Sequence, residues 1–576
     1  MTFRGRVFWL WMLGIALAGV AGHLILDGAA QGVKGKRGGR LVISKSRVPR
    51  SLNRLFASDD PTTSITNCMS GSLIRINRVS QQPEPDVAQS WKVSPDGKRI
   101  TFTLRPGLKF SDGRPATVDD VVFSFQLIND PKVNAPASDQ FNFEGQRVRV
   151  EKVDAATIAF VFPTPRAAAI RLFDGIPILP RHILESAYRA GRIEQAWSLS
   201  TPPDQIVGLG PFRLKSYVPD QRVILQRNDY YWKTSSSGER LPFLDELVFS
   251  IDRERNAQLL KFQQGETDLL SPVNAEELSS LAAIERQGRI KIHDLGPSLI
   301  REILWFNLNE SKLASGRSAV DPVKLSWFKD IRFRQAISHA IDRQSIVKLV
   351  FAGRAAPQWG FVSVGDRLWF NSSVAKYPLD TSRSLQLLRE AGFTYRADQK
   401  LLVDSQGRPV TFTLLTNVNP LRQKVTALLQ NDFAKIGIRV SLATLESGSL
   451  LSRVNESFDY ESCLLAIVSG DSDPSSQSNV LLSGGAQHWW QPNQVKPATS
   501  WEARIDELMR QQMTTVNTAA RKRLFDEVQR IMAEQQPFIF LVARNLMISA
   551  KTNIGNLRPA QLPDFVLWNC EELFRG

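Results

Sequence analysis

The chain has 576 residues, too many for one compact core, so two or three domains are expected. Hydrophobic residues make up 43% of the chain and charged residues 22%, which is ordinary for a soluble globular protein. The formal net charge is +15, but aromatic residues are not interleaved with basic runs, and no zinc-finger spacing or RNA-binding signature occurs. A nucleic-acid partner is therefore not expected, because net charge governs nonspecific attraction rather than fold.

Residues 1–30 have the features of a secretion signal, which predicts an extracytoplasmic protein. A basic start precedes an apolar run over 7–26, and the small residues at 28–30 suit a cleavage site. An uncleaved membrane anchor is the alternative, because the run approaches the ~20 residues that span a bilayer. The following stretch, 34–54, carries eight basic and no acidic side chains, which predicts a solvated basic arm.

The folded part is expected to begin with a strand at 39–43. The stretch 86–128 then predicts a hairpin followed by a helix. The hairpin turns at Ser94-Pro95-Asp96-Gly97, whose residue types set turn dihedrals, and the strand after it alternates apolar and polar side chains. Thr117 and Asp120 have the spacing of a capping box, so the helix should begin there.

Further strands are predicted before residue 270. Two alternating segments lie within 147–162, and two strands within 206–232 flank a turn at Pro219-Asp220. A strand at 247–251, a helix at 256–264 and a strand from 268 complete this part. The connection through a helix predicts that the last two strands are parallel.

The second half of the chain also mixes strands and helices. A strand is predicted at 303–307, and Asp330 and Asp342 are placed to cap two helices, the second of which should end at Gly353. The other predicted elements are strands at 411–415, 438–442 and 537–542, helices at 421–435 and 518–534, and an apolar run at 464–468.

Several motifs follow one another along the chain. They are D-G-K-R-I-T-F-T-L-R-P-G-L-K-F at 96–110, D-G-R-P-A-T at 112–117, V-G-L-G-P-F at 207–212 and R-F-R-Q-A-I-S-H-A-I-D-R at 332–343. Together they resemble the signature segments of the family 5 extracellular solute-binding proteins, which include the oligopeptide- and dipeptide-binding receptors of ABC importers. The resemblance runs from about residue 38 to the end, although Leu209 stands where the family usually has Thr or Ser.

The resemblance implies an α/β fold of two lobes, periplasmic-binding-protein-like and of type II, with an extra subdomain in the first lobe. It also implies that the chain crosses between the lobes twice, near residues 296 and 540. The expected division assigns 1–30 to the signal peptide or anchor, 31–80, 206–295 and 541–576 to lobe I, 81–205 to the extra subdomain and 296–540 to lobe II.

Motifs for catalysis and for metal binding are missing from the sequence. The chain has no G-x-S-x-G, H-E-x-x-H or Walker A motif, and its three cysteines allow at most one disulfide and have no metal spacing. Asp471 and Asp473 could begin a calcium loop, but Ser476 and Leu482 stand where an EF-hand needs Gly and Glu. No catalytic residue, metal ligand or cofactor is therefore expected.

The resemblance implies a ligand site between the lobes. In relatives, an aspartate just before a D/E-P pair meets the α-ammonium of the ligand, and Asp471, ahead of Asp473 and Pro474, is the matching residue. Its spacing departs from the family pattern, so Asp473 stays an alternative, and either aspartate could instead form an ordinary turn. Trp359, Trp490 and Asn307 are further candidates for ligand contact, although most tryptophans are core residues.

These inferences predict a periplasmic, monomeric receptor that binds peptides and delivers them to the permease and ATPase of an ABC importer. Backbone groups of an extended peptide can pair with protein strands and give affinity without sequence choice. Hinge closure of two lobes would hold the ligand without a covalent step. The alternatives are a receptor of the same fold for a metal chelate, haem or an opine-like solute, and a periplasmic hydrolase, against which the missing nucleophile motifs argue.

Overall fold

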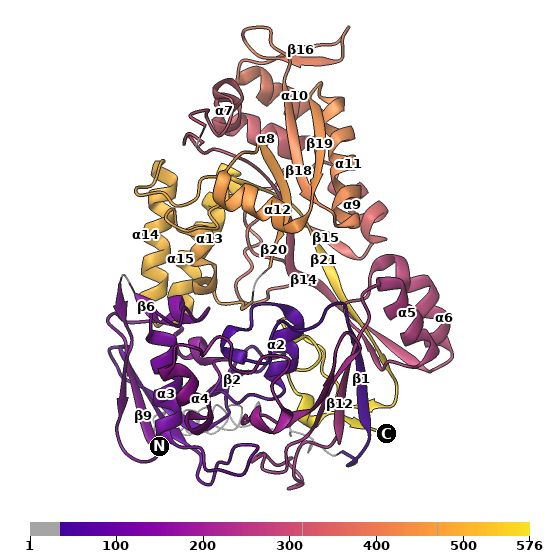
Figure 1. Cartoon of the computed structure of the whole chain (residues 1–576). Coiled ribbons are helices and arrows are strands. Elements are labelled where there is room, and N and C mark those ends of the chain that lie inside the picture. The colour runs from indigo at the N-terminus through magenta and orange to yellow at the C-terminus, as the bar shows by residue number, and fades with distance from the viewer. Residues whose placement is uncertain (1–34, 144, 314, 469) are drawn as a thin grey trace, which may run out of the picture.

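The computed structural model describes residues 35–143, 145–313, 315–468 and 470–576. The predicted signal or anchor at 1–30 lies outside these residues. Two large hydrophobic cores organise the rest, one built mainly from residues 41–249 and 546–573 and the other from residues 303–542. We term the halves around them lobe I and lobe II (Figure 1). Within the described residues, no helix is both long and apolar enough to cross a membrane.

One mixed sheet runs through both lobes. Its strands are β1 (Arg40–Lys45), β10 (Phe212–Val218), β11 (Arg222–Arg227), β12 (Glu246–Ile251), β13 (Leu269–Leu270), β14 (Ile290–Phe306), β15 (Ala355–Pro357), β18 (Thr411–Asn417), β19 (Arg439–Leu445), β20 (Ser462–Ile467) and β21 (Phe538–Lys551). Their order is β10-β11-β12-β1-β13-β21-β14-β20-β18-β19, and β15 pairs with β21 off this path. The strands predicted at 39–43, within 206–232, at 247–251 and from 268 are therefore confirmed and share one sheet with those predicted at 303–307, 411–415, 438–442 and 537–542.

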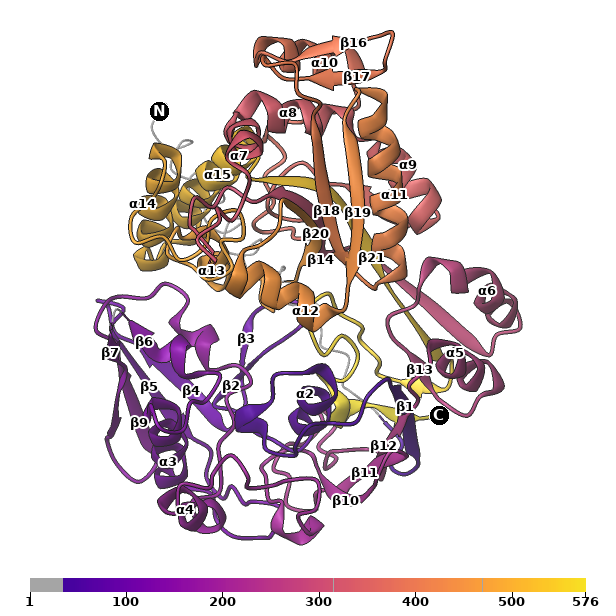
Figure 2. The same cartoon turned by 45° about the horizontal axis from the view of Figure 1, so that its top comes forward.

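The long strands β14 and β21 join the lobes (Figure 2). β21 passes from the core of lobe II, which holds residues 538–542, to the core of lobe I, which holds Leu546. The antiparallel pairing of the two strands shifts register between Asp294 and Arg301, so the ladder is interrupted where the lobes meet. The predicted lobe boundaries, at 295/296 and 540/541, fall inside these strands and stay a prediction.

Both connecting strands are longer than the sequence predicted. The prediction covered 303–307 and 537–542, which are the apolar halves within lobe II. The half of β14 that was missed contains Gly296 and Pro297, where the apolar pattern stops and proline cannot donate a ladder hydrogen bond. The part of β21 that was missed, 543–551, has the polar pair Arg544 and Asn545 near its start.

The parallel strands of the two lobes point toward each other. β1 is parallel to both β12 and β13, so the prediction that β12 and β13 are parallel is confirmed, with β1 lying between them. In lobe II, β18 is parallel to β19 and β20. Three successive antiparallel pairings, β13–β21, β21–β14 and β14–β20, separate these groups, so the lobe I strands run opposite to the lobe II strands. The carboxyl ends of both groups consequently face the junction between the lobes.

Helices cover this sheet and build the edges of the lobes. They are α2 (Asp60–Asn67), α3 (Val118–Asn129), α4 (Arg181–Arg189), α5 (Arg255–Gln264), α6 (Leu278–Arg286), α7 (Pro322–Lys329), α8 (Ile331–Ala340), α9 (Arg343–Phe351), α10 (Thr381–Glu390), α11 (Pro420–Lys435), α12 (Ser447–Ser452), α13 (Ser478–Leu481), α14 (Ser500–Thr514) and α15 (Thr518–Gln535). The predicted caps are confirmed, since Asp330 accepts from the backbone N–H of Arg332 at 2.8 Å and Asp342 accepts from that of Ser345 at 2.9 Å.

A separate antiparallel sheet occupies the part of lobe I that was expected to be an extra subdomain. Its order is β4-β5-β9-β8, from β4 (Ala88–Val93), β5 (Arg99–Leu104), β9 (Thr157–Val161) and β8 (Arg149–Lys152). The predicted hairpin is β4–β5, and α3 begins after Thr117, whose backbone N–H donates to Asp120 at 2.9 Å. Phe125 of α3 packs on Phe160 of β9 with ring centroids 4.5 Å apart, which fixes the helix on the sheet.

The remaining strands form isolated two-stranded pairs. These pairs are β2 (Ile74–Ile76) with β3 (Pro83–Pro85), β6 (Asn142–Phe143) with β7 (Gln146–Arg147), β16 (Thr394–Arg396) with β17 (Leu401–Val403), and β22 (Ile554–Gly555) with β23 (Phe574–Arg575).

Candidate functional site between the lobes

A cavity of about 580 Å³ lies where the carboxyl ends of the parallel strands converge. Lys45 ends β1, Ser271 follows β13 and Val468 follows β20, and all three line the cavity. Open α/β sheets bind ligands beyond the carboxyl ends of their strands. The volume also falls within the range of about 300–1,000 Å³ that is usual for small-molecule pockets. The topology of both lobes therefore points to one candidate site.

The charged lining of this cavity is predominantly basic. Its basic side chains are those of Lys45, Arg253, Arg255, Arg354 and Arg544, and its acidic ones are those of Asp60 and Asp564. Most of the cations have an acidic partner: Lys45 meets Asp60 at 2.9 Å, and Arg354 meets Asp294 at 3.1 Å. Such pairs leave little net charge for a ligand.

Arg544 differs from the other cations of the lining. It lies on β21, and its guanidinium has no ion pair or hydrogen bond to any residue within the described ranges. Burial lowers the pKa of Arg544, an effect that Glu302 opposes and Arg422 reinforces, while Glu302 itself is held by Arg422 at 3.0 Å. A half-buried, unpaired guanidinium is a ready partner for an anion such as a carboxylate.

Asp471 lies on the loop after β20 and is bound by Arg171. Arg171 belongs to a short 3₁₀ helix, Ala169–Phe173, in lobe I, and its Nε donates to Oδ2 of Asp471 at 2.6 Å while Nη2 donates to Oδ1. A second donation, from Nη1 of Arg171 to the carbonyl of Gln81 at 2.7 Å, fixes the guanidinium in lobe I. Burial lowers the pKa of Arg171, but Asp471 outweighs it and the net shift is upward. The pair thus links the two lobes.

The carboxylate of Asp471 does not line the large cavity in this conformation. It lines a small adjoining pocket with Leu299 and Arg301 of β14, whereas Ser298 and Ile300 line the large cavity. Successive residues of a strand point to opposite faces. Asp471 would therefore have to leave Arg171 and turn before it could meet a ligand held in the large cavity.

Asp473, the alternative anchor, is buried in an ion pair within lobe II. Arg521 of α15 donates from Nη1 to Oδ2 at 2.9 Å and from Nη2 to Oδ1 at 2.8 Å. Oδ1 also accepts from the backbone N–H of Ser475 at 2.9 Å, which caps the 3₁₀ helix Pro474–Gln477. Burial raises the pKa of Asp473, but Arg521 and these hydrogen bonds bring it below its ordinary value. This geometry holds the loop that carries Asp471.

The other three candidate residues lie apart from the cavity. Asn307 is fully buried, and its Nδ2 donates to the carbonyls of Phe458 at 2.8 Å and Tyr460 at 2.9 Å. Trp490 is also fully buried, with its indole N–H donating to Glu502 at 2.9 Å. Trp359 is half-buried beneath the guanidinium of Arg343, 4.6 Å from the ring centroid. Ligand contact by these three residues stays a prediction.

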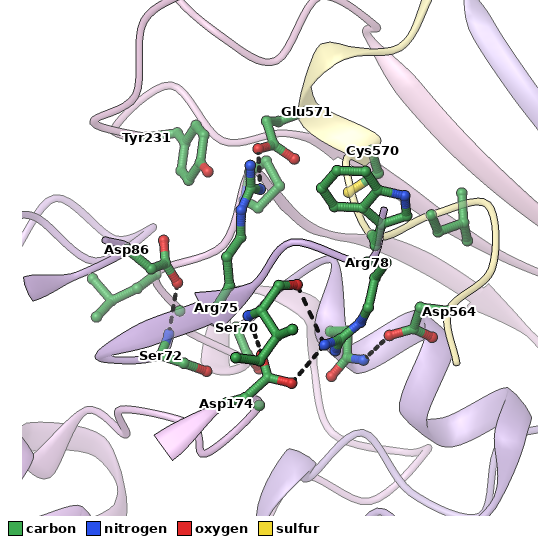
Figure 3. Close-up of a pocket in the computed structure, with 18 residues that line it drawn as sticks. Ser70, Ser72, Arg75, Arg78, Asp86, Asp174, Tyr231, Asp564, Cys570 and Glu571 are labelled. Carbon is green, nitrogen blue, oxygen red and sulfur yellow. Dashed lines mark hydrogen bonds and ion pairs between the residues drawn. The ribbon is translucent and has the colours of Figure 1, made fainter. Parts of the chain in front are cut away.

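A second cavity, of about 100 Å³, lies inside lobe I (Figure 3). Its charged groups pair with one another: Arg75 meets Glu571 at 2.5 Å, and Arg78 meets Asp174 at 2.7 Å. Asp86, which accepts from the backbone N–H of Ser72 at 3.0 Å, has its pKa raised by burial. These contacts attach the C-terminal part of the chain to lobe I.

A family model described as bacterial extracellular solute-binding proteins, family 5 Middle, matches residues 82–489. The chain belongs to family 5 of the bacterial extracellular solute-binding proteins. This family 5 protein is 29% identical over 518 residues to the "Probable ABC transporter-binding protein" of Deinococcus radiodurans, covering 86% of this chain and 85% of that one. It is 25% identical over 520 residues to the "Dipeptide-binding protein" of Escherichia coli, covering 87% and 88%.

The fold of this family 5 protein is that of a solved relative. The Bacillus subtilis oligopeptide-binding protein AppA, in complex with a nonapeptide, superimposes with a TM-score of 0.73 at 24% identity, covering 94% of this chain and 100% of that one. The predicted α/β, two-lobed, type II periplasmic-binding-protein fold is confirmed. The family resemblance drawn from the motifs is confirmed as well.

Sequence reasoning did not select Arg171 or Arg544. Arg171 lies 300 residues from Asp471, in a stretch that carries no motif, so no spacing could have paired the two. Arg544 lies two residues after the predicted strand at 537–542, and extending that strand would have brought it to the lobe junction. Sequence patterns could therefore have identified Arg544 but not Arg171.

Proposed function

We propose that this family 5 protein is the extracytoplasmic receptor of an ABC importer and that it binds peptides in the interlobe cavity. The observation that carries the proposal is the cavity of about 580 Å³ at the converging strand ends, with Arg544, which has no ion-pair partner among the described residues, in its wall. The names of the relatives, an ABC transporter-binding protein and a dipeptide-binding protein, support the same class of ligand and partner.

A peptide has one positively charged group, its α-ammonium, and one negatively charged group, its carboxylate. We propose that its carboxylate binds Arg544, because an ionised acceptor gives the strongest hydrogen bonds to a guanidinium. The α-ammonium replaces Arg171 on Asp471, which requires the carboxylate of Asp471 to turn toward the large cavity. The peptide backbone pairs with strand ends around the cavity, which leaves the side chains free of sequence demands.

Closure of the lobes completes the proposed mechanism. The interrupted pairing between Asp294 and Arg301 gives the connecting strands a place to bend, and hinge closure around a ligand needs only a few such positions. The ion pair between Arg171 and Asp471 bridges the lobes until the α-ammonium of a ligand takes the place of Arg171 on the carboxylate. Binding and release then require no covalent step and no catalytic residue.

The partners and location follow from this role. We propose a periplasmic monomer, exported through residues 1–30, that docks on the permease of an importer whose ATPase drives uptake. The carboxylate of Asp471 and the guanidinium of Arg544 suit a peptide, which has a free ammonium and a carboxylate, whereas haem has carboxylates but no ammonium.

Mass spectrometry of the ligand released from purified, denatured protein tests the proposal directly. We expect small peptides with free amino and carboxyl ends. Release of haem, a metal chelate or an opine-like solute in their place would contradict the peptide assignment. A parallel incubation with a peptide library separates the receptor from a hydrolase, because a receptor returns the peptides uncleaved.

A further inference from the structure

The C-terminal segment, residues 564–571, is fastened to lobe I by polar contacts around the small cavity of Figure 3. Near its start, Asp564 accepts from the side-chain amide of Asn67, the last residue of α2. At its end, Glu571 binds both Arg75, at 2.5 Å, and Lys233, at 2.6 Å. The segment therefore has two fixed points on lobe I.

Two cysteines are chain neighbours of residues that make these fixed points. Cys68 follows Asn67 at the end of α2, and Cys570 precedes Glu571. Both are free thiols in the core of lobe I, with 2% and 4% of their surface exposed, and the interaction with Cys68 raises the pKa of Cys570. The third cysteine, Cys463, lies in the core of lobe II. Only one pair of thiols among the described residues is thus brought together.

We propose that Cys68 and Cys570 form a disulfide that locks the C-terminal segment to α2. Disulfides persist in oxidising compartments outside the cytoplasm, which is where the family is found. The bond would join segments 502 positions apart (570 minus 68), so it constrains the unfolded chain strongly. The proposal does not depend on which solute the cavity takes.

The oxidation proceeds by exchange with a small disulfide such as oxidised glutathione. One protein thiolate attacks that disulfide, forming a mixed disulfide and releasing one glutathione thiolate, and the second protein thiolate then displaces the other glutathione. The protein loses two protons and two electrons, and the small disulfide gains them as two thiols. Contact with Cys68 and burial raise the pKa of Cys570, so the exchange is expected during folding rather than in the folded protein.

The bond has a consequence for the interlobe site. Residues 564–567 form part of the wall of the large cavity. Fixing the segment at both Cys570 and Asp564 keeps that wall in place while the lobes move. The disulfide is therefore a stabilising element of the lobe I half of the site.

Thiol counting after refolding in a glutathione redox buffer tests the proposal. The full chain is unfolded in denaturant without reductant, alkylated with iodoacetamide, digested and analysed by mass spectrometry. We expect one alkylated cysteine, Cys463, together with a cross-linked peptide that contains Cys68 and Cys570. Prior reduction should give three alkylated cysteines. Three alkylated cysteines without reduction, or a cross-link that includes Cys463, would overturn the proposal.

Matched variants guard against misfolding as the explanation. Cys463→Ser should refold to a protein without any alkylatable cysteine, and Cys570→Ser should leave both remaining cysteines alkylatable. Hydrogen exchange of residues 564–571 gives a second readout. Reduction of the wild type should speed exchange there. In the oxidised state, Cys463→Ala and the wild type should exchange at the same rate. Equal exchange in the oxidised and reduced wild type would contradict the locking role.

Discussion

Two aspartates on one loop illustrate how location decides what an ion pair does. Asp473 and Arg521 both belong to lobe II and are 8% and 6% exposed, so the pair forms and stays buried with the fold. Asp471 and Arg171 come from different lobes and are 25% and 14% exposed, so their pair can break when the lobes separate. The first pair stabilises a loop, and the second can exchange its cation for that of a ligand.

The same comparison extends to the arginines of the large cavity. Arg354 forms an ion pair with Asp294 at 3.1 Å, whereas Arg544 has no ion-pair partner within the described ranges. A receptor needs both kinds of group, because paired charges hold its walls and unpaired ones select its ligand.

The largest effect is expected from Arg521→Ala. Removing the guanidinium leaves the carboxylate of Asp473 buried and unpaired, which costs about 3–5 kcal/mol of the free energy of unfolding. Denaturant unfolding of lobe II measures the loss. Arg530→Ala, on the same helix, removes an exposed pair with Glu534 and should cost less than about 1 kcal/mol. Equal losses for the two variants would contradict the distinction.

Asp471→Ala should weaken binding of a free-amino peptide by about 2–5 kcal/mol, the usual cost of losing one partner of a desolvated charge pair. Isothermal titration calorimetry measures the change. The free energy of unfolding should move far less than in Arg521→Ala, because Asp471 is not enclosed in a lobe core. Unchanged affinity would remove Asp471 from the site and leave it only the bridging role.

Arg544→Met should weaken binding by about 1.5–3 kcal/mol, the range for a hydrogen bond to a charged group. The loss should appear with free-carboxylate peptides and vanish when the same peptides carry a C-terminal amide. Arg354→Met, at the same cavity, is the control and should change affinity little because Arg354 is already paired. A loss of the same size with the amide would show that Arg544 acts through packing alone.

Arg171→Met should tighten binding of a free-amino peptide by about 1 kcal/mol, roughly fivefold, because the ligand no longer displaces a partly exposed partner. Small-angle scattering should show a more open unliganded protein, since the bridge between lobes is gone. Weaker binding in this variant would mean that Arg171 contacts the ligand rather than competing with it.

The smallest expected effect is a loss of folding stability at low pH. The pKa of Asp473 is lowered in the folded protein, because Arg521 outweighs burial. The stability that this shift contributes is present above the ordinary pKa, near 3.8, and is lost as pH falls through the lower folded value. Acid unfolding followed by circular dichroism should therefore steepen below pH 4 in the wild type. Arg521→Ala should lack this contribution.

Local patterns predicted most of the elements. The capping residues Asp330 and Asp342 and the turn at Pro219-Asp220 each specify a boundary from side-chain chemistry alone, and the structure has all three. The connecting strands were predicted only in part, because their polar stretches around Pro297 and Arg544 do not alternate. Local periodicity does not report which polar residues a hinge requires.

The candidate site was predictable only from the family resemblance. Asp471 and Asp473 look alike in sequence, and nothing local distinguishes the one that meets Arg521 inside a lobe from the one that meets Arg171 across the junction. The sequence also does not show that Trp490 and Asn307 are core residues, because their hydrogen-bond partners lie elsewhere in the chain.

A thermodynamic cycle on the ligand ammonium tests the exchangeable pair most directly. The affinities of one tripeptide and its N-acetylated form are measured by calorimetry with the wild type and with Asp471→Asn. Acetylation should weaken binding to the wild type by about 2 kcal/mol or more and change binding to Asp471→Asn little. An equal loss in both proteins would contradict this prediction.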